Sequence, residues 1–221
     1  AHTDNDLKIL AERLFGAKVT AFVAGSAGVS VALAEVLGDS RSGRHLQTPS
    51  LTPVGRTLIV TASQRTIVYE QIKRLGDQIN LAQAEISIDE IVQGIGPASM
   101  DRISGITARE RVVVLRVGKL DSSAILADGD LQAMAEMIVR NLGQVVRTVT
   151  DTTIPDVLVV IGGDTTSGVL SACGVESLEL KGELQPGTVS GVPANGSISD
   201  RLLITRAGGF GDKNALLELI S

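Results

Sequence analysis

The residues best suited to chemistry in this sequence form a glycine-rich polar stretch that runs from Gly162 to Gly168. Glycines let the main chain approach a ligand closely, so that backbone N–H groups can point at one spot. Such groups stabilise anionic oxygens, above all those of phosphate, without any lysine or arginine. The hydroxyl and carboxylate side chains between the glycines add polar atoms. The candidates for phosphate binding are Gly162, Gly163, Asp164, Thr165, Ser167 and Gly168.

This stretch follows a strand-like run and precedes an apolar segment. Residues 157–161 are all apolar and lie between Pro155 and Gly162, which is typical of a strand buried on both faces. The segment that contains Val169 and Leu170 can form a helix, whose positive end would then face the polar loop. The alternative interpretation is a tight turn in which Thr166 or Ser167 caps the helix.

Two well-known nucleotide motifs are absent. Val169 and Leu170 stand where a Walker loop needs Lys and Ser or Thr, so the stretch is not a P-loop. No G-x-G-x-x-G follows a predicted strand with an acidic residue at the end of the next one. This absence disfavours a dinucleotide-dependent enzyme.

Three further turns carry glycine or serine near the end of a predicted strand, at Gly25, Ser63 and Gly208. In a parallel sheet all strand-to-helix loops open on the same edge, so we expect these turns to converge with the one at Gly162. Gly208, Gly209 and Gly211 surround Phe210 and would let the backbone wrap a ligand. For Gly25 the alternative is simple turn chemistry with Ser26 as the helix cap.

The alternation of apolar runs predicts an α/β fold, a three-layer sandwich with a largely parallel, Rossmann-like sheet. We expect strands at 18–24, 56–62, 85–88, 111–117, 157–161, 176–184 and 201–206. We expect helices at 7–15, 29–37, 66–75, 88–95, 131–149 and 214–220, and a short one after the polar stretch. Loops are expected at 39–55, 94–105, 121–130 and 185–193. Met134 and Met137 are interpreted as core residues of the long helix.

Composition excludes several classes of function. The chain has 221 residues, a net charge of −5 and only 2% aromatic residues, so neither a basic nucleic-acid footprint nor a base-stacking surface is expected. The single cysteine, Cys173, is expected to be a buried core thiol, and His2 and His45 do not suggest a catalytic dyad. No apolar run reaches membrane-spanning length and no signal-peptide pattern is present, so we expect a cytoplasmic protein.

Three blocks, taken together, resemble a known family. They are Gly162-Gly163-Asp164-Thr165 with Ser167-Gly168, then 185–187 with 191–193, then 206–212. In this order and spacing they resemble the nucleotide-binding C-terminal domain of the four-carbon acid sugar kinases. Residues 22–28 and 63–71 also look like family blocks, so the resemblance covers nearly the whole chain.

The resemblance implies an ATP-dependent kinase that phosphorylates a four-carbon sugar acid such as threonate, erythronate or an oxo relative. Family members hold the sugar acid in an N-terminal domain and ATP in a C-terminal domain, and this chain resembles the second. Residues 1–55 would be a leading segment and linker and residues 56–221 the ATP-binding core, with the N-terminal substrate domain absent. The resemblance places ATP or ADP at Ser63, at the turn from Gly162 to Thr165 and at the turn from Gly208 to Gly211.

Some positions depart from the family pattern. Ala62 stands where the family usually has Gly, and Arg65 and Val68 replace Ser and Thr, whereas Gln71 is kept. Arg206 replaces the usual Lys before the last glycine turn and preserves its charge.

The ATP-binding hypothesis leaves the metal and the base to be assigned. Asp164 is the candidate for approaching Mg²⁺ directly or through water, and the alternative is that it caps the following helix. No catalytic base is apparent, and the resemblance assigns it to the N-terminal domain. We therefore expect nucleotide binding with little or no kinase activity from these residues alone.

Two other functions remain as alternatives: a non-catalytic nucleotide- or ligand-binding module and a dinucleotide-dependent oxidoreductase. The expected partners are a nucleotide and, through the N-terminal domain, a small sugar acid. We expect no nucleic-acid or membrane partner, and a homodimer stays open.

Overall fold

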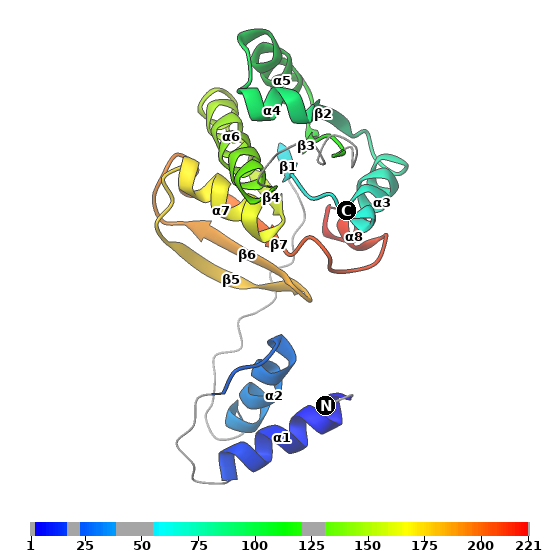
Figure 1. Cartoon of the computed structure of the whole chain (residues 1–221), viewed down its shortest axis with the longest axis vertical. Coiled ribbons are helices and arrows are strands. Elements are labelled where there is room, and N and C mark those ends of the chain that lie inside the picture. The colour runs from blue at the N-terminus through cyan, green and yellow to red at the C-terminus, as the bar shows by residue number, and fades with distance from the viewer. Residues whose placement is uncertain (1–2, 17–22, 39–54, 121–130, 221) are drawn as a thin grey trace. The chain divides into compact units, whose positions relative to one another are not determined.

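The computed structural model describes residues 3–16, 23–38, 55–120 and 131–220 (Figure 1). The chain divides into two compact units, residues 1–46 and residues 47–221. The predicted strand at 18–24 falls mostly outside the described residues, and Val23 and Ala24 have no regular secondary structure. The linker expected at 39–55, apart from Gly55, and the connection expected at 121–130 also lie outside the described residues.

The first unit contains two helices, α1 (Asp4–Gly16) and α2 (Ala27–Gly38), which confirm the helices expected at 7–15 and 29–37. Thr3 and Asp6 cap α1 reciprocally, since each backbone N–H donates to the other side chain at 3.1 and 3.2 Å. The buried residues of the two helices are the small Ala11 and Ala32. The larger Phe15 is 56% exposed.

The second unit is built on a mixed sheet, which in the described residues has seven strands in the order β2-β3-β1-β4-β7-β6-β5. The parallel part confirms the predicted α/β class, and an antiparallel hairpin extends it at one edge. The parallel strands are β1 (Thr57–Thr61), β2 (Ala82–Ile86), β3 (Val112–Val117), β4 (Val157–Ile161) and β7 (Leu202–Arg206). The hairpin consists of β5 (Leu178–Gln185) and β6 (Thr188–Pro193).

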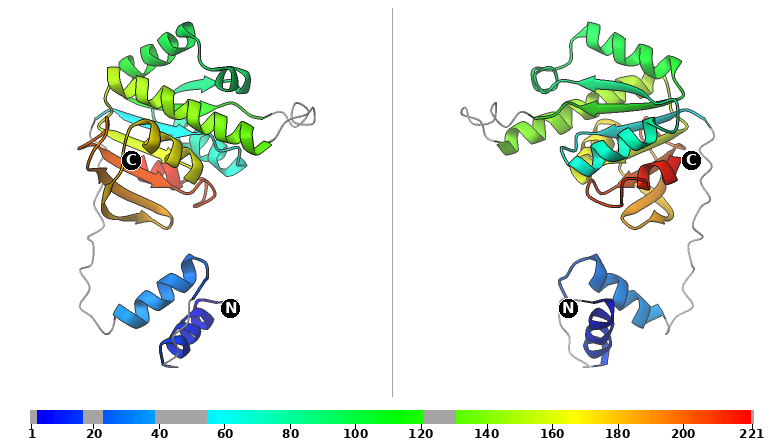
Figure 2. Two further views of the ribbon diagram at one scale, coloured as in Figure 1. Left: turned by 60° about the vertical axis from the view of Figure 1, so that its left-hand side comes forward. Right: turned by 90° about the vertical axis from the view of Figure 1, so that its right-hand side faces the viewer.

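Helices cover both faces of the sheet (Figure 2). One face carries α4 (Ile88–Gln93), α5 (Pro97–Arg109), α6 (Leu131–Thr152) and α7 (Gly163–Ala172). The other face carries α3 (Thr66–Gly76) and α8 (Ala215–Ile220). A three-layer sandwich is therefore confirmed for this unit.

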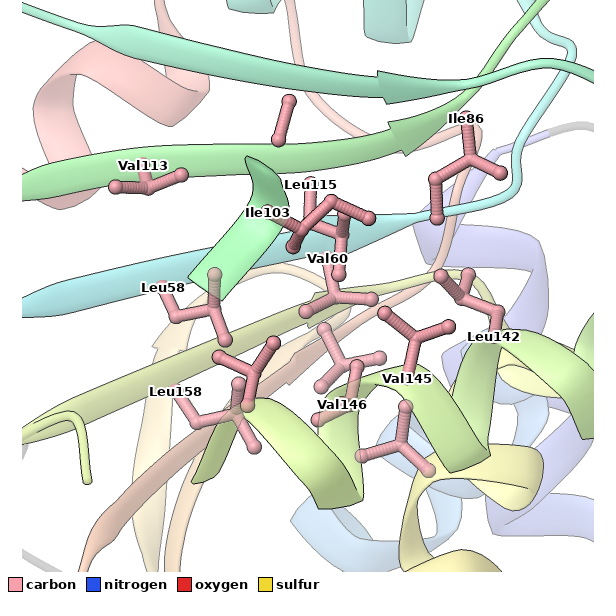
Figure 3. Packing of buried hydrophobic residues seen from close by; sticks show 14 of the residues in the cluster. Leu58, Val60, Ile86, Ile103, Val113, Leu115, Leu142, Val145, Val146 and Leu158 are labelled. Atoms are coloured by element: carbon pink, nitrogen blue, oxygen red, sulfur yellow. The ribbon is translucent and has the colours of Figure 1, made fainter. Parts of the chain in front are cut away.

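Strand alternation explains the two cores. In β1, Leu58 and Val60 belong to the larger core, whereas Ile59 belongs to the smaller one, because successive side chains point to opposite faces. Figure 3 shows Leu58 and Val60 packed with residues of neighbouring strands and with Val146 of α6. All residues of β1 and of β4 are buried, as the continuous apolar runs predicted.

Two expected loops were wrong. The segment 94–105 contains most of α5, because Pro97 occupies the first helical position, where the missing N–H costs no hydrogen bond. The segment 185–193 contains β6, because Pro186 and Gly187 form the turn of a hairpin whose second strand pairs with both β5 and β7. Gly187 has a positive φ of 72°, which suits glycine.

None of the helices in the described ranges combines the length and the apolar character that a membrane crossing requires.

Candidate functional site

Three strand-ending turns meet at the carboxyl edge of the sheet. They follow β1, β4 and β7, which are neighbours in the sheet and run parallel. A Cβ placed on Gly208 would lie 3.2 Å from Ser63 Oγ and 3.7 Å from Gly162 Cα. The predicted convergence therefore holds for Ser63, Gly162 and Gly208. Gly25 belongs to the other compact unit, and its part in this convergence stays a prediction.

The turns line a pocket of about 560 Å³. Seven of the ten predicted site residues line it: Ser63, Gly162, Gly163, Asp164, Thr165, Gly208 and Gly209. Its volume lies within the range of about 300–1,000 Å³ that is usual for small-molecule sites. The carboxyl edge of a parallel sheet is also where ligands of α/β proteins bind.

The turn after β4 is shorter than predicted. Gly162, with φ of 111°, is the N-cap, and α7 begins at Gly163. Thr166 donates its N–H and its hydroxyl to the carbonyl of Gly162, at 2.9 and 2.8 Å, so it lies inside the helix. The alternative interpretation, in which Thr166 or Ser167 caps this helix, was therefore wrong.

The start of α7 has no side-chain cap. A helix leaves its first N–H groups without intrahelical partners, and here these belong to Gly163, Asp164 and Thr165. Asp164 is exposed, and no hydrogen bond or ion pair engages its carboxylate among the described residues. The first turn of α7 thus presents free N–H donors and one carboxylate to the pocket.

Thr165 connects the turns after β1 and β4 through a hydrogen bond. Its side chain is buried, and its Oγ1 accepts a hydrogen bond from the Ala62 N–H at 3.4 Å. The hydroxyl therefore links the turn after β1 to the turn after β4. What Thr165 still offers the pocket is its backbone N–H.

The turn after β1 leads into a second uncapped helix. Arg65 is the N-cap of α3 and makes no side-chain capping bond. The Ser63 N–H donates to Thr61 Oγ1 at 3.1 Å, and Ser63 Oγ accepts from the Arg65 N–H at 3.4 Å. Arg65, the N-cap of α3, and the first turn of α7 line the same pocket.

Gln64, which the sequence did not single out, braces this turn. Its Nε2 donates to the Gly118 carbonyl at 3.1 Å, and its Oε1 accepts from the Leu120 N–H at 2.9 Å. The residues that follow β3 are thereby held against the turn after β1.

The turn after β7 is stabilised by hydrogen bonds from two side chains, those of Gln71 and Arg206. Gln71 Nε2 donates to the carbonyls of Phe210 and Asp212 at 3.2 and 2.7 Å. The buried Arg206 guanidinium also donates to the Phe210 carbonyl, and burial lowers the pKa of Arg206. Arg206 therefore supports the turn rather than lining the pocket. Gly211, with φ of 76°, packs against Arg206 and Ala215 and does not line the pocket either.

Ser167 and Gly168 also lie elsewhere. Both line a second groove, of about 760 Å³, between α6 and α7. A Cβ on Gly168 would lie 2.6 Å from the Val139 carbonyl oxygen, so this glycine permits close helix packing. Gly143 of α6 meets the Gly168 backbone in the same way.

One wall of the pocket is apolar, which the sequence did not indicate. Met134, interpreted as a core residue, is partly buried against the larger core and also lines the pocket. The apolar lining residues with large side chains are Leu120, Leu131, Met134, Ile138, Val139 and Phe210.

The prediction for Cys173 is confirmed, because it is a buried free thiol. Burial raises the pKa of this thiol. Within the described ranges, no cluster of three or more His, Cys, Asp or Glu residues could hold a metal ion.

The geometry agrees with comparisons to known proteins. A family model described as a nucleotide-binding C-terminal domain matches residues 58–216. D-threonate kinase of Cupriavidus necator is 28% identical over 98% of this chain and 51% of its own length. D-threonate kinase of Salmonella typhimurium is 23% identical over 98% of this chain and 52% of its own length. The chain spans about half the length of the curated relatives it matches.

Solved structures share the fold. A Bordetella bronchiseptica domain of unknown function, a domain-swapped dimer with bound citrate, has a TM-score of 0.63 and 21% identity. The match covers 99% of this chain and 51% of that one. A Haemophilus influenzae protein has a TM-score of 0.62 and 14% identity, with 98% and 51% covered.

Proposed function

This chain belongs to the nucleotide-binding C-terminal domains of the four-carbon acid sugar kinase family, and we propose that its pocket binds ATP and ADP. In the proposed full-length enzyme, the bound ATP phosphorylates a four-carbon sugar acid of the threonate, erythronate or oxo-tetronate type. The two D-threonate kinase relatives support this class of substrate. A cytoplasmic location and a homodimer are part of the same proposal.

The observation that carries the proposal is the meeting of two uncapped helix N-termini in one pocket. The first N–H groups of α3 and α7 have no side-chain acceptor. Each helix end carries about half a positive charge, so an anion between them is stabilised twice. An acidic protein can hold a polyphosphate in this way.

The pocket also offers separate places for the two halves of a nucleotide. The free N–H groups of Gly163, Asp164 and Thr165 suit phosphate oxygens. The apolar side chains of Leu131, Met134 and Ile138 suit the face of a nucleobase. We propose that the phosphates lie over the start of α7 and the base against the start of α6.

Mg²⁺ fits this arrangement only together with the nucleotide. Among the described lining residues, Asp164 supplies the single carboxylate, and Mg²⁺ commonly binds one or two carboxylates plus substrate phosphates and waters. We propose that Asp164 approaches the ion directly or through water. The ion would neutralise phosphate charge, which phosphoryl transfer requires.

The sugar acid and the catalytic base are proposed to lie on a separate substrate domain. The relatives are about twice as long as this chain, and the single carboxylate among the described pocket residues, that of Asp164, is assigned to Mg²⁺ in this proposal. The first unit also supports a further packing partner, because it exposes large apolar side chains such as those of Phe15 and Val31.

Ligand-induced stabilisation tests the nucleotide assignment. A ligand present at about 100 times its Kd adds about 2.7 kcal/mol to the stability of the folded state, which raises Tm by about 5 °C or more for a domain of this size. We expect ADP with Mg²⁺ to produce this shift and NAD to produce none. A shift with NAD alone would favour an oxidoreductase, and a shift with neither would contradict the proposal.

The kinase assignment needs a separate assay. We expect these residues alone to transfer little or no phosphate from ATP to threonate or erythronate, since the proposed base lies on another domain. Robust phosphorylation by this chain would show that the base is here. Mass spectrometry of the sugar acid gives the readout.

A further inference from the structure

The pocket has one cationic side chain, that of Arg65, and it has no partner among the described residues. Arg65 reaches from the N-cap of α3 toward the turn after β7, where a Cβ on Gly209 would lie 3.1 Å from Arg65 Nη1 and 3.4 Å from its Cζ. No hydrogen bond or ion pair engages this guanidinium among the residues that the structure describes. Arg74, in the last turn of the same helix, is by contrast bound to Asn214 at 3.1 Å.

The charges facing the pocket are unequal. Arg65 and Asp164 are the charged residues among its described lining, and two positive helix ends are added to them. The sum is positive although the whole chain carries −5. The pocket therefore favours anionic ligands, although the chain as a whole is acidic.

Position within the pocket indicates which phosphate Arg65 reaches. Leu120 follows β3 and Gly209 follows β7, and these strands are at opposite ends of the row β3-β1-β4-β7. Leu120 lies on the side of β3, whereas the Arg65 guanidinium lies at Gly209, next to the apolar Phe210. A nucleotide whose base meets Leu120 and the start of α6 therefore directs its outer phosphates toward Arg65.

We propose that Arg65 binds the outer phosphates of a nucleoside di- or triphosphate and gives this pocket its preference for these ligands over a monophosphate. The inference rests on the proposed function of the pocket. Guanidinium donors suit phosphate oxygens because they form charge-assisted, often paired hydrogen bonds. The phosphate nearest the nucleoside is left to the N–H groups of α7.

Calorimetric titration of the wild type, Arg65→Gln and Arg65→Lys with ADP and with AMP tests the proposal. We expect Arg65→Gln to weaken ADP binding about tenfold and AMP binding less than about threefold, since only ADP reaches the side chain. Arg65→Lys should restore part of the loss, because it keeps the charge. Wild-type affinity for ADP should also fall more steeply with salt than that of Arg65→Gln.

Arg109→Gln is the matched control, because Arg109 is an exposed cation at the opposite edge of the sheet, just before β3. It changes net charge equally and should leave ADP binding unchanged. Equal losses for ADP and AMP, or no loss in Arg65→Gln, would overturn the role of Arg65 while the proposed function stands. A wild type that binds no nucleotide would overturn both.

Discussion

Gly163 and Gly168 belong to the same helix and have opposite surroundings. A Cβ on Gly163 meets nothing within 4 Å, and the residue lines the pocket. A Cβ on Gly168 would press into Val139 of α6, 2.6 Å from its carbonyl oxygen. The first turn of α7 is therefore open to a ligand, whereas the second turn packs closely against α6.

Glycine therefore has two different roles within one short stretch of sequence: Gly163 leaves space for a ligand, and Gly168 allows close helix packing. The stretch from Gly162 to Gly168 has the glycine spacing of a phosphate-binding loop, but only its first part faces the pocket. Its second part lets two helices approach closely. Substitutions in the two halves should thus have separable effects on binding and on stability.

Gly168→Val should give the largest effect. The added side chain clashes with the backbone of α6, which cannot move without opening the core, so we expect a loss of about 3 kcal/mol in unfolding free energy. Urea unfolding followed by circular dichroism measures it. Ser167→Ala, at the exposed neighbouring position, should change stability by less than about 0.5 kcal/mol. Equal midpoints for the two variants would refute the packing role.

Gly163→Val should reverse this pattern. The space around Gly163 accommodates a side chain, so we expect stability to change by less than about 1 kcal/mol. A branched side chain over the free N–H groups should nevertheless weaken ADP binding about a hundredfold, which corresponds to about 2.7 kcal/mol. Gly163→Ala should weaken it less. Full ADP affinity in the valine variant, measured by calorimetry, would mean that the phosphates of ADP do not bind at the start of α7.

Gln71→Leu tests the third turn. It removes two hydrogen bonds that hold the carbonyls of Phe210 and Asp212, so we expect a loss of about 1–2 kcal/mol. Because the Gly208–Gly209 backbone lines the pocket, ADP affinity should fall by a few-fold as well. A stability loss with unchanged ADP affinity would mean that the turn does not contact the nucleotide.

The smallest expected effect concerns Cys173, the C-cap residue of α7. Burial raises the pKa of its thiol above the ordinary value of 9.0, so the unfolded chain ionises before the folded one. Its contribution to stability is therefore present below pH 9 and declines as the pH rises further. From pH 8 to 10 the wild type should lose slightly more stability than Cys173→Ala, by less than about 1 kcal/mol. An equal loss would mean that the thiol titrates normally.

The same thiol reports on the two halves of α7. Cys173 should resist a disulfide reagent in the wild type and in Gly163→Val, and it should react faster in Gly168→Val, where the helix is displaced. Protection in all three proteins would mean that the core does not open.

Much of the fold could be predicted because its central strands are continuous apolar runs. Residues 112–115 of β3 and all of β4 show this pattern. The helix α5 could not be predicted, since Pro97 and Gly105 resemble helix breakers and only the position of Pro97 in the first turn removes its cost. The strand β6 contains Ser190 and Gly191 and is formed through pairing with its neighbours rather than by propensity.

The convergence of three turns could be predicted from the sequence, because it depends on the backbone. The glycine and serine turns could be identified because strand ends in a parallel sheet share an edge. The apolar lining of the pocket could not be predicted. Helical periodicity shows that Met134 is on an apolar face but does not show whether this face packs into the core or lines a pocket. Gly211 and Gly168 do not line the pocket, although both were predicted to. Glycine spacing does not show whether a glycine faces a ligand or packs against a neighbouring segment.

The most direct test of the nucleotide site is an amide NMR titration with ADP and Mg²⁺. The signals of Gly163, Asp164, Thr165 and Gly208 should move first and farthest, and those of Ser167 to Ala172 should move little. Shifts confined to the groove between α6 and α7, or no shifts at saturating ADP, would contradict nucleotide binding at the start of α7.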